Sequence, residues 1–216
     1  MGIPVLIIGE SGSGKSASLR NFQKEEVFVA NVAGKPFPFR GQLTTFCSDR
    51  YADWKDETGK IRTGLDSAIR KAEEKGFQTI VIDDCQYLMA NEFMRRSGET
   101  GYQKFTDIGR NFWALVKMVS DDLSPNVIVY FLGHVARDEN GNEHLKTIGK
   151  LLDEKITVEG LFSIVLKTSV QDGKYQFRTQ TNGADTVKSP IGMFETVEID
   201  NDLKLVDEAV RRYWEI

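Results

Sequence analysis

Residues 9–16 combine glycines, hydroxyl groups and a lysine at the spacing of a phosphate-binding loop. They match the pattern G-x-x-x-x-G-K-[ST] and read Gly9, Glu10, Ser11, Gly12, Ser13, Gly14, Lys15 and Ser16. An apolar run at 3–8 precedes them, and a helix-compatible stretch at 16–23 follows. Because glycines let the backbone bend closely around a ligand, successive amides can point at the α- and β-phosphates of a nucleotide. We therefore expect this phosphate loop, residues 9–16, to bind a nucleoside triphosphate.

Single side chains of this segment have distinct expected roles, with ATP and Mg²⁺ as the ligands. Lys15 should reach the β- and γ-phosphates, and the Ser16 hydroxyl should bind Mg²⁺. Ala17, directly after the loop, belongs to the same nucleotide-binding segment. A helix predicted over 15–24 should add the field of its positive end. The alternative is a Gly/Ser-rich turn that matches by chance, which the regular flanking elements disfavour.

Two acids follow an apolar run and are candidates for metal binding and catalysis. Residues 80–82 are apolar and end in Asp83, which should emerge beside the phosphate loop and hold Mg²⁺. Asp84 could orient the attacking water, although either acid could instead only cap the next helix. Phosphoryl transfer depends on positioning and charge neutralisation, so an Asp could support slow hydrolysis. Glu10 is a competing candidate for the base.

His134 follows the apolar run at 126–132, which predicts another strand. A polar side chain at that strand end could touch the γ-phosphate, so we interpret His134 as a sensor of it. A structural hydrogen-bonding role is the alternative. His144 lies in a polar stretch and is given no role.

Basic and aromatic residues interleave in the segment after these acids, a pattern suited to stacking bases and neutralising phosphates. Residues 89–112 hold four Lys or Arg against three acids. The alternative is a solvated helical hairpin with aromatic residues in its core. The candidate nucleic-acid contacts are Arg95, Arg96, Tyr102, Lys104 and, in the later polar segment 137–150, Arg137.

Composition sets limits on these interpretations. The chain has 216 residues, of which 40% are hydrophobic and 28% charged, and a net charge of −4. This acidity disfavours strong nucleic-acid binding by a monomer. Cys47 and Cys85 lie far apart, which favours reduced thiols in a cytosol. No signal segment or apolar run long enough to span a bilayer is present, so we expect a cytoplasmic protein.

The elements that must position these residues alternate in type along the chain. Apolar strands are predicted at 3–8, 26–31, 79–84 and 126–132, with helices at about 15–24, 61–75, 86–96 and 103–120. This alternation predicts an α/β fold with a mostly parallel sheet flanked by helices. A polar loop at 137–146, a short helix at 148–156, a hairpin of 161–170 and 174–180, and a closing helix at 202–214 should complete it. We expect one domain over 1–216, with 161–216 part of it.

In this order of motifs the chain resembles RecA-superfamily ATPases. It is most similar to small bacteriophage nucleotide-binding proteins related to phage single-strand-annealing ATPases, which carry a stretch like residues 31–40, Asn-Val-Ala-Gly-Lys-Pro-Phe-Pro-Phe-Arg. The resemblance implies a RecA-like core and an ATPase that acts on single-stranded DNA in phage recombination or replication. It implies DNA-facing loops at about 89–105 and 135–148, with His134 as the γ-phosphate sensor. In a homo-oligomeric ring or filament, Lys188 would reach into a neighbour's ATP site.

One departure from this family concerns the catalytic base. RecA-type enzymes carry a Glu directly after the second strand, whereas residues 29–32 here read Val-Ala-Asn-Val. Fast hydrolysis by an isolated subunit is therefore not expected, and Asp84 is the substitute. An ATP-switched loader or assembly factor without DNA binding remains an alternative. A small-molecule kinase is a further one, although the lid region 137–150 holds one Arg where kinases usually carry several.

Overall fold

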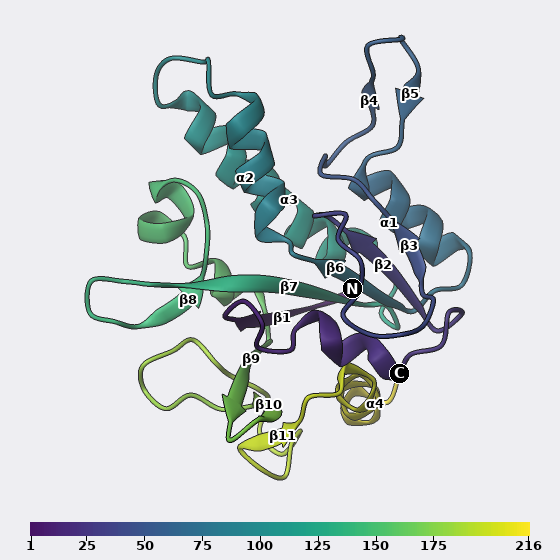
Figure 1. Cartoon of the computed structure of the whole chain (residues 1–216), viewed down its shortest axis with the longest axis vertical. Coiled ribbons are helices and arrows are strands. Elements are labelled where there is room, and N and C mark those ends of the chain that lie inside the picture. The colour runs from purple at the N-terminus through teal and green to yellow at the C-terminus, as the bar shows by residue number, and fades with distance from the viewer.

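A mostly parallel β-sheet forms the centre of the molecule in the computed structural model, which describes the backbone of residues 1–216 and the side chains of residues 1–152 and 155–216 (Figure 1). Within this part of the chain the sheet has nine strands in the order β11-β10-β9-β1-β7-β6-β2-β3, with β8 paired to β7. The strands are β1 (Ile3–Gly9), β2 (Val27–Asn31), β3 (Thr44–Phe46), β6 (Thr79–Asp83), β7 (Ile128–Arg137), β8 (Glu143–Leu145), β9 (Ile164–Gln171), β10 (Lys174–Arg178) and β11 (Glu198–Asp200). The predicted α/β class with a mostly parallel sheet is confirmed.

Helices cover both faces of this sheet because the apolar strand residues alternate in direction. Leu6 and Ile8 pack in one core with α1, α2 and α3, whereas Val5 and Ile7 pack in a second core with η1 and α4. The two layers of helices lie above and below the sheet in Figure 1. The helices are η1 (Ser16–Asn21), α1 (Leu65–Glu74), α2 (Gln86–Arg95), α3 (Gln103–Asp122), η2 (Leu151–Lys155), η3 (Val158–Leu161) and α4 (Leu203–Trp214).

The strand order brings three functional strand ends to one edge. β1 pairs in parallel with β9 and β7, and β7 pairs in parallel with β6. Gly9 at the end of β1 lies opposite His134 of β7, and Asp83 at the end of β6 lies opposite Asn31 of β2. Since parallel strands end at a common edge, the phosphate loop and the candidate acids meet there.

The prediction of a helix over 15–24 is wrong in both the length and the type of the helix. The structure has a six-residue 3-10 helix there, η1. The chain leaves it at Phe22, which has an extended backbone and packs into the core beneath α4. A helix this short has little macrodipole, so the expected contribution of a helix end to phosphate binding is not supported.

The strand predicted to end before Gly133 continues to Arg137 and turns back as β8. Gly133 lies within this strand. A Cβ at this position would lie 2.3 Å from Leu145 Cδ1, so only a glycine leaves room for that side chain. The glycine therefore allows β8 and its buried leucine to pack closely on β7. The short helix predicted over 148–156 is reduced to the single π-helical turn η2.

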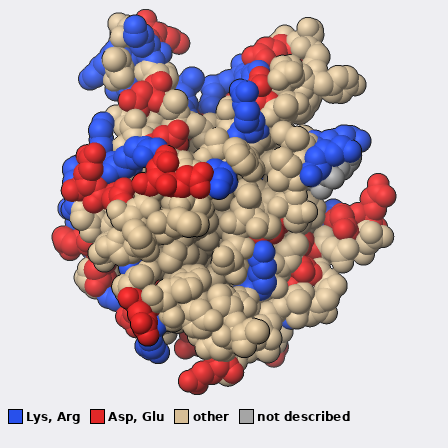
Figure 2. Space-filling view, turned by 180° about the vertical axis from the view of Figure 1, so that it is seen from behind, with Lys and Arg blue, Asp and Glu red and all other residues tan. Residues whose placement is uncertain are grey.

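Two projections rise from one end of the molecule. One is an arm of two short antiparallel strands, β4 (Trp54–Lys55) and β5 (Ile61–Arg62), so the helix predicted from 61 begins only at Leu65. The other is the α2–α3 tip, which consists of the end of α2, the turn at 96–102 and the start of α3, and both helices match their predicted bounds closely. Figure 2 shows a notch between them, and a cavity of about 650 Å³ is lined by residues of both, among them Trp54 and Arg95.

The C-terminal prediction is largely confirmed. β9 and β10 form a hairpin whose turn residues, Asp172 and Gly173, have φ of 50° and 77°, as an Asp-Gly hairpin turn requires. α4 begins after Asp202, whose side chain accepts a hydrogen bond from the Lys204 amide and so caps the helix.

The helices in the described part of the chain are all too short or too polar to cross a membrane.

Candidate phosphate-binding site

The phosphate loop curves between β1 and η1 with two glycines in conformations that other residues avoid. Gly12 and Gly14 have φ of 77° and 100°. The loop is closed by the Ser13 amide, which donates to the Glu10 carbonyl at 3.3 Å. Such a loop can form an anion-binding concavity of backbone amides, as the sequence predicts.

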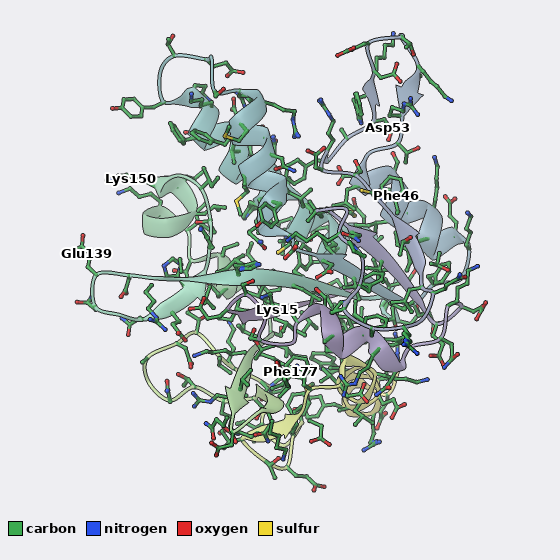
Figure 3. All side chains as sticks on the ribbon, viewed as in Figure 1. Lys15, Phe46, Asp53, Glu139, Lys150 and Phe177 are labelled. Carbon is green, nitrogen blue, oxygen red and sulfur yellow. The ribbon has the colours of Figure 1, made fainter. Side chains whose placement is uncertain are left out.

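Lys15 lies near the centre of the molecule, at the carboxyl edge of the sheet (Figure 3). Its Nζ donates to the carbonyls of Gly9 and Glu10, at 2.8 Å each. Burial lowers the pKa of this ammonium, while the carboxylates of Asp84 and Asp83 act in the opposite direction. A buried cation bound to neutral carbonyls can be stabilised further by an anionic ligand.

Ser16 and Asp83 are 67 residues apart in the sequence but are in contact. Ser16 is the first residue of η1 and Asp83 the last residue of β6, and the two lie together at the carboxyl edge of the sheet. The Ser16 hydroxyl donates to Asp83 Oδ1 at 2.9 Å. Burial and the neighbouring Asp84 carboxylate raise the pKa of Asp83 to about 6. A bound divalent cation would stabilise the Asp83 carboxylate and so offset both effects on its pKa. Hydroxyl and carboxylate oxygens are ligands that suit Mg²⁺. In the described residues no cluster of three or more His, Cys, Asp or Glu forms a metal site, so further ligands would have to come from phosphate or water.

Asp84 occupies an unusual conformation between the side chains of a lysine and a histidine. Its φ is +61°, a left-handed value that is uncommon outside glycine. One carboxylate oxygen lies 2.9 Å from Lys35 Nζ and the other 3.3 Å from His134 Nε2. Burial alone would raise the pKa of Asp84, but the hydrogen bonds from His134 and Lys35 outweigh it and lower the pKa to about 2. The predicted sensor and the predicted base are therefore in direct contact.

Residues of β9, of β10 and of the segment after β11 pack against the phosphate loop. Thr168 of β9 shares a hydrogen bond of 2.5 Å with Ser13, and a Cβ at Gly9 would lie 1.7 Å from the Thr168 hydroxyl oxygen. A Cβ at Gly14 would lie 2.9 Å from the Tyr175 ring and 3.0 Å from Asn201 Oδ1. Both glycines are thus required by close approach, and Gly14 also by its positive φ.

A cavity of about 430 Å³ opens over these groups. The phosphate loop lines one side, Asp83, Asp84 and His134 line another, and residues 35–38 and Tyr175 complete it. Ala17 also lines it. The cavity thus offers backbone amides, a buried ammonium and an oxygen pair suited to Mg²⁺, which together fit a Mg²⁺-bound triphosphate.

The candidate DNA contacts do not line this cavity, and their cationic groups are engaged within the chain. Arg95 pairs with Asp49 at 2.5 Å, and Arg96 with Glu92, Glu99 and Asp107. Lys104 is buried, donates to the Glu99 carbonyl at 2.7 Å and lies near the rings of Phe93 and Phe105. Arg137 binds Glu143 at 3.0 Å and lies 3.8 Å from Glu10. Tyr102, by contrast, is 88% exposed at the α2–α3 tip.

Lys188 does not line the cavity of its own chain. Its backbone pairs with Val165 of β9, and its side chain is exposed. Glu10 is exposed at the lip of the phosphate loop and points toward Arg137 rather than toward Asp83.

Sequence reasoning missed Lys35, Thr168, Tyr175 and Asn201. Lys35 carried a usable signal, because it follows a parallel strand that ends at the same sheet edge as the phosphate loop. The other three lie in β9, in β10 and directly after β11, and the sequence does not state that β9 pairs with β1 and so brings these residues to the phosphate loop.

Comparison with known proteins adds little. No protein-family model matches the chain, and no curated protein matches it. Among solved structures, the ATPase DotB of Legionella pneumophila aligns with a TM-score of 0.32 and 10% identity, covering 98% of this chain and 52% of DotB. The chain thus spans about half the length of DotB. A likeness at this level establishes neither a shared fold nor a shared activity.

Proposed function

We propose that this protein binds ATP with Mg²⁺ at the phosphate loop and hydrolyses it, slowly as an isolated subunit. The observation that carries the proposal is the hydrogen bond of 2.9 Å between Ser16 and Asp83. It joins the last residue of the phosphate loop to the acid predicted from a separate part of the chain. Mg²⁺ held there would neutralise phosphate charge and orient the phosphate chain.

Hydrolysis requires an acceptor for the proton of the attacking water. Asp84 is the candidate, since it lines the same cavity as Lys15 and Asp83. Its ion pair with Lys35 and its contact with His134 hold it as a carboxylate, but a carboxylate with so low a pKa is a weak base. Slow turnover follows from this arrangement, in agreement with the missing Glu after β2.

We further propose that the protein is RecA-like and acts on single-stranded DNA. Placement of β7 between the phosphate-loop strand and β6 agrees with the expected sheet, in which the sensor strand lies next to the strand that ends in Asp83. DNA would meet the α2–α3 tip, where Tyr102 offers an exposed ring for stacking. Lys188 would complete the site of a neighbouring subunit, an arrangement compatible with its exposed side chain.

A second candidate is an ATP-switched loader or assembly factor without DNA binding. The ion pairs of Arg95 and Arg96 and the burial of Lys104 favour it, since a basic group already paired within the chain is poorly available to DNA phosphates.

The nucleotide proposal is tested by replacing Lys15. Lys15→Ala removes the cation that should reach the β- and γ-phosphates, so ATP binding should fall by about 100-fold or more. The measurement is isothermal titration calorimetry with ATP and Mg²⁺, alongside a circular dichroism melt to show that the variant is folded.

Lys24→Ala is the matched control, because Lys24 is exposed and lies outside the cavity. It should bind ATP like the parent protein. If Lys15→Ala bound ATP as tightly as the parent, the phosphate loop would not be the nucleotide site.

A further inference from the structure

We propose that Lys35 is a binding residue for the terminal phosphate and distinguishes ATP from ADP. In this inference, which rests on the proposed function, Lys35 leaves Asp84 and binds the γ-phosphate when ATP enters. The 32–38 loop, which carries Lys35, would then report which nucleotide is bound.

The position of Lys35 in the cavity supports a role in γ-phosphate binding. The phosphate loop and Lys15 should hold the β-phosphate, so a γ-phosphate extends beyond them toward the ends of β6 and β7. Lys35 stands at that place, since its Nζ lies 2.9 Å from Asp84 and it lines the same cavity as Lys15. Its ammonium also lies 5.0 Å from the centre of the Tyr87 ring, on the first turn of α2.

The side chain is free to exchange partners at low cost. The Lys35 side chain is 61% exposed and the Asp84 side chain 12% exposed, so the ammonium of this ion pair is largely hydrated, and Asp84 keeps its contact with His134 when Lys35 leaves. The γ-phosphate carries more negative charge than one carboxylate, and it offers three acceptor oxygens. A lysine on a flexible stem can therefore move from Asp84 to the phosphate without a change in the core.

The backbone that carries Lys35 is, in contrast, well positioned. Asn31 Nδ2 donates to the Lys35 carbonyl at 2.6 Å, and Gly34 has a φ of 64° that closes the preceding turn. Pro36 and Pro38 restrict the residues that follow. The loop thus presents the ammonium to the cavity from a fixed backbone, while most of the side chain is exposed to solvent.

A diphosphate would not reach this group. ADP fills the phosphate loop but leaves the Lys35–Asp84 pair intact, so removal of the Lys35 charge should affect ATP and ADP differently. A purely structural Lys35, which only fixed Asp84, would affect both nucleotides alike.

The test compares nucleotide affinities of Lys35→Met by isothermal titration calorimetry. With Mg²⁺ and the non-hydrolysable analogue AMP-PNP, the affinity should fall by about 10- to 100-fold. With Mg²⁺ and ADP it should change by less than about threefold. Lys35→Arg should restore most of the AMP-PNP affinity, because it keeps a cation at the same place.

Arg40→Met is the control for loss of one positive charge, since Arg40 is exposed in the same segment but does not line the cavity. It should leave both affinities unchanged. Equal losses for AMP-PNP and ADP, no loss for either, or an equal effect of Arg40→Met would each overturn the role of Lys35. If the parent protein bound neither nucleotide, the proposed function itself would be wrong. If only Lys15→Ala abolished binding, the function would stand and this inference would not.

Discussion

At the scale of single residues, the site is defined by how Asp84 is held. Its left-handed backbone costs about 1–3 kcal/mol for a residue other than glycine, and such strain is concentrated at functional sites. The conformation brings the carboxylate into contact with Lys35, in the loop after β2, and with His134 of β7. Asp83, one residue earlier, instead accepts from Ser16. The two adjacent acids thus interact with different side chains.

Asp84→Asn tests the catalytic role of this residue. Asn tolerates the left-handed conformation, so the backbone should be preserved. If Asp84 accepts the proton of the attacking water, hydrolysis should fall by about 100-fold or more while ATP binding is retained. The measurements are phosphate release at saturating ATP and calorimetric titration. Glu10→Gln should leave the rate unchanged, and an unaffected rate in Asp84→Asn would direct the search to Glu10 or to a neighbouring subunit.

At the scale of elements, α4 is attached to the sheet by a buried polar group as well as by apolar contacts. Asp207 on α4 accepts hydrogen bonds from Thr79 at 3.1 Å, from Tyr130 at 3.0 Å and from Arg211 at 2.7 Å. Thr79 and Tyr130 belong to β6 and β7. The contact therefore joins the last helix to the two strands that end in Asp83 and continue through His134.

Asp207→Ala should consequently destabilise the protein by about 2–4 kcal/mol, because three donors lose their buried acceptor. Equilibrium unfolding in urea gives this free energy directly. Glu208→Ala is the matched control, since Glu208 is exposed on the same helix, and it should change stability by less than about 0.5 kcal/mol. A loss in Asp207→Ala no larger than in the control would mean that apolar packing alone holds α4.

At the scale of the whole molecule, the candidate nucleotide site and Tyr102, the exposed candidate DNA contact, lie in different places. The cavity lies at the carboxyl edge of the sheet, whereas Tyr102 lies at the α2–α3 tip. On the face shown in Figure 2, Lys and Arg side chains are interspersed with Asp and Glu, in keeping with the net charge of −4. Strong binding of DNA by one subunit is therefore not expected, and an ATP-dependent assembly would have to align several weak surfaces.

Fluorescence anisotropy with a labelled single-stranded oligonucleotide tests this expectation. Binding should require ATP and Mg²⁺, weaken as salt rises, and coincide with assembly seen by light scattering. Tyr102→Ala should weaken it by about 10-fold through loss of stacking, while Tyr213→Ala on α4 should not. Assembly with ATP but without DNA binding at low salt would favour the assembly factor.

The sequence alone determined the parts of the protein that depend on local chemistry. The phosphate-loop glycines, the apolar strand that ends in Asp83 and the Asp-Gly turn at 172–173 each follow from short-range rules, and the structure has these elements where they were predicted. The α/β alternation also fixed the parallel sheet, because parallel strands need helical crossovers.

Tertiary structure decided what depends on distant partners. η1 is short because Phe22 turns into the core, and β7 passes through Gly133 because Leu145 needs the space that a Cβ would fill. Lys104 reads as a DNA contact in the sequence but is buried against two aromatic rings. The Lys35–Asp84–His134 contact joins the loop after β2, the end of β6 and the strand β7, and so depends on the strand order. Packing geometry and ion pairing act between residues far apart in the chain, and no local pattern encodes them.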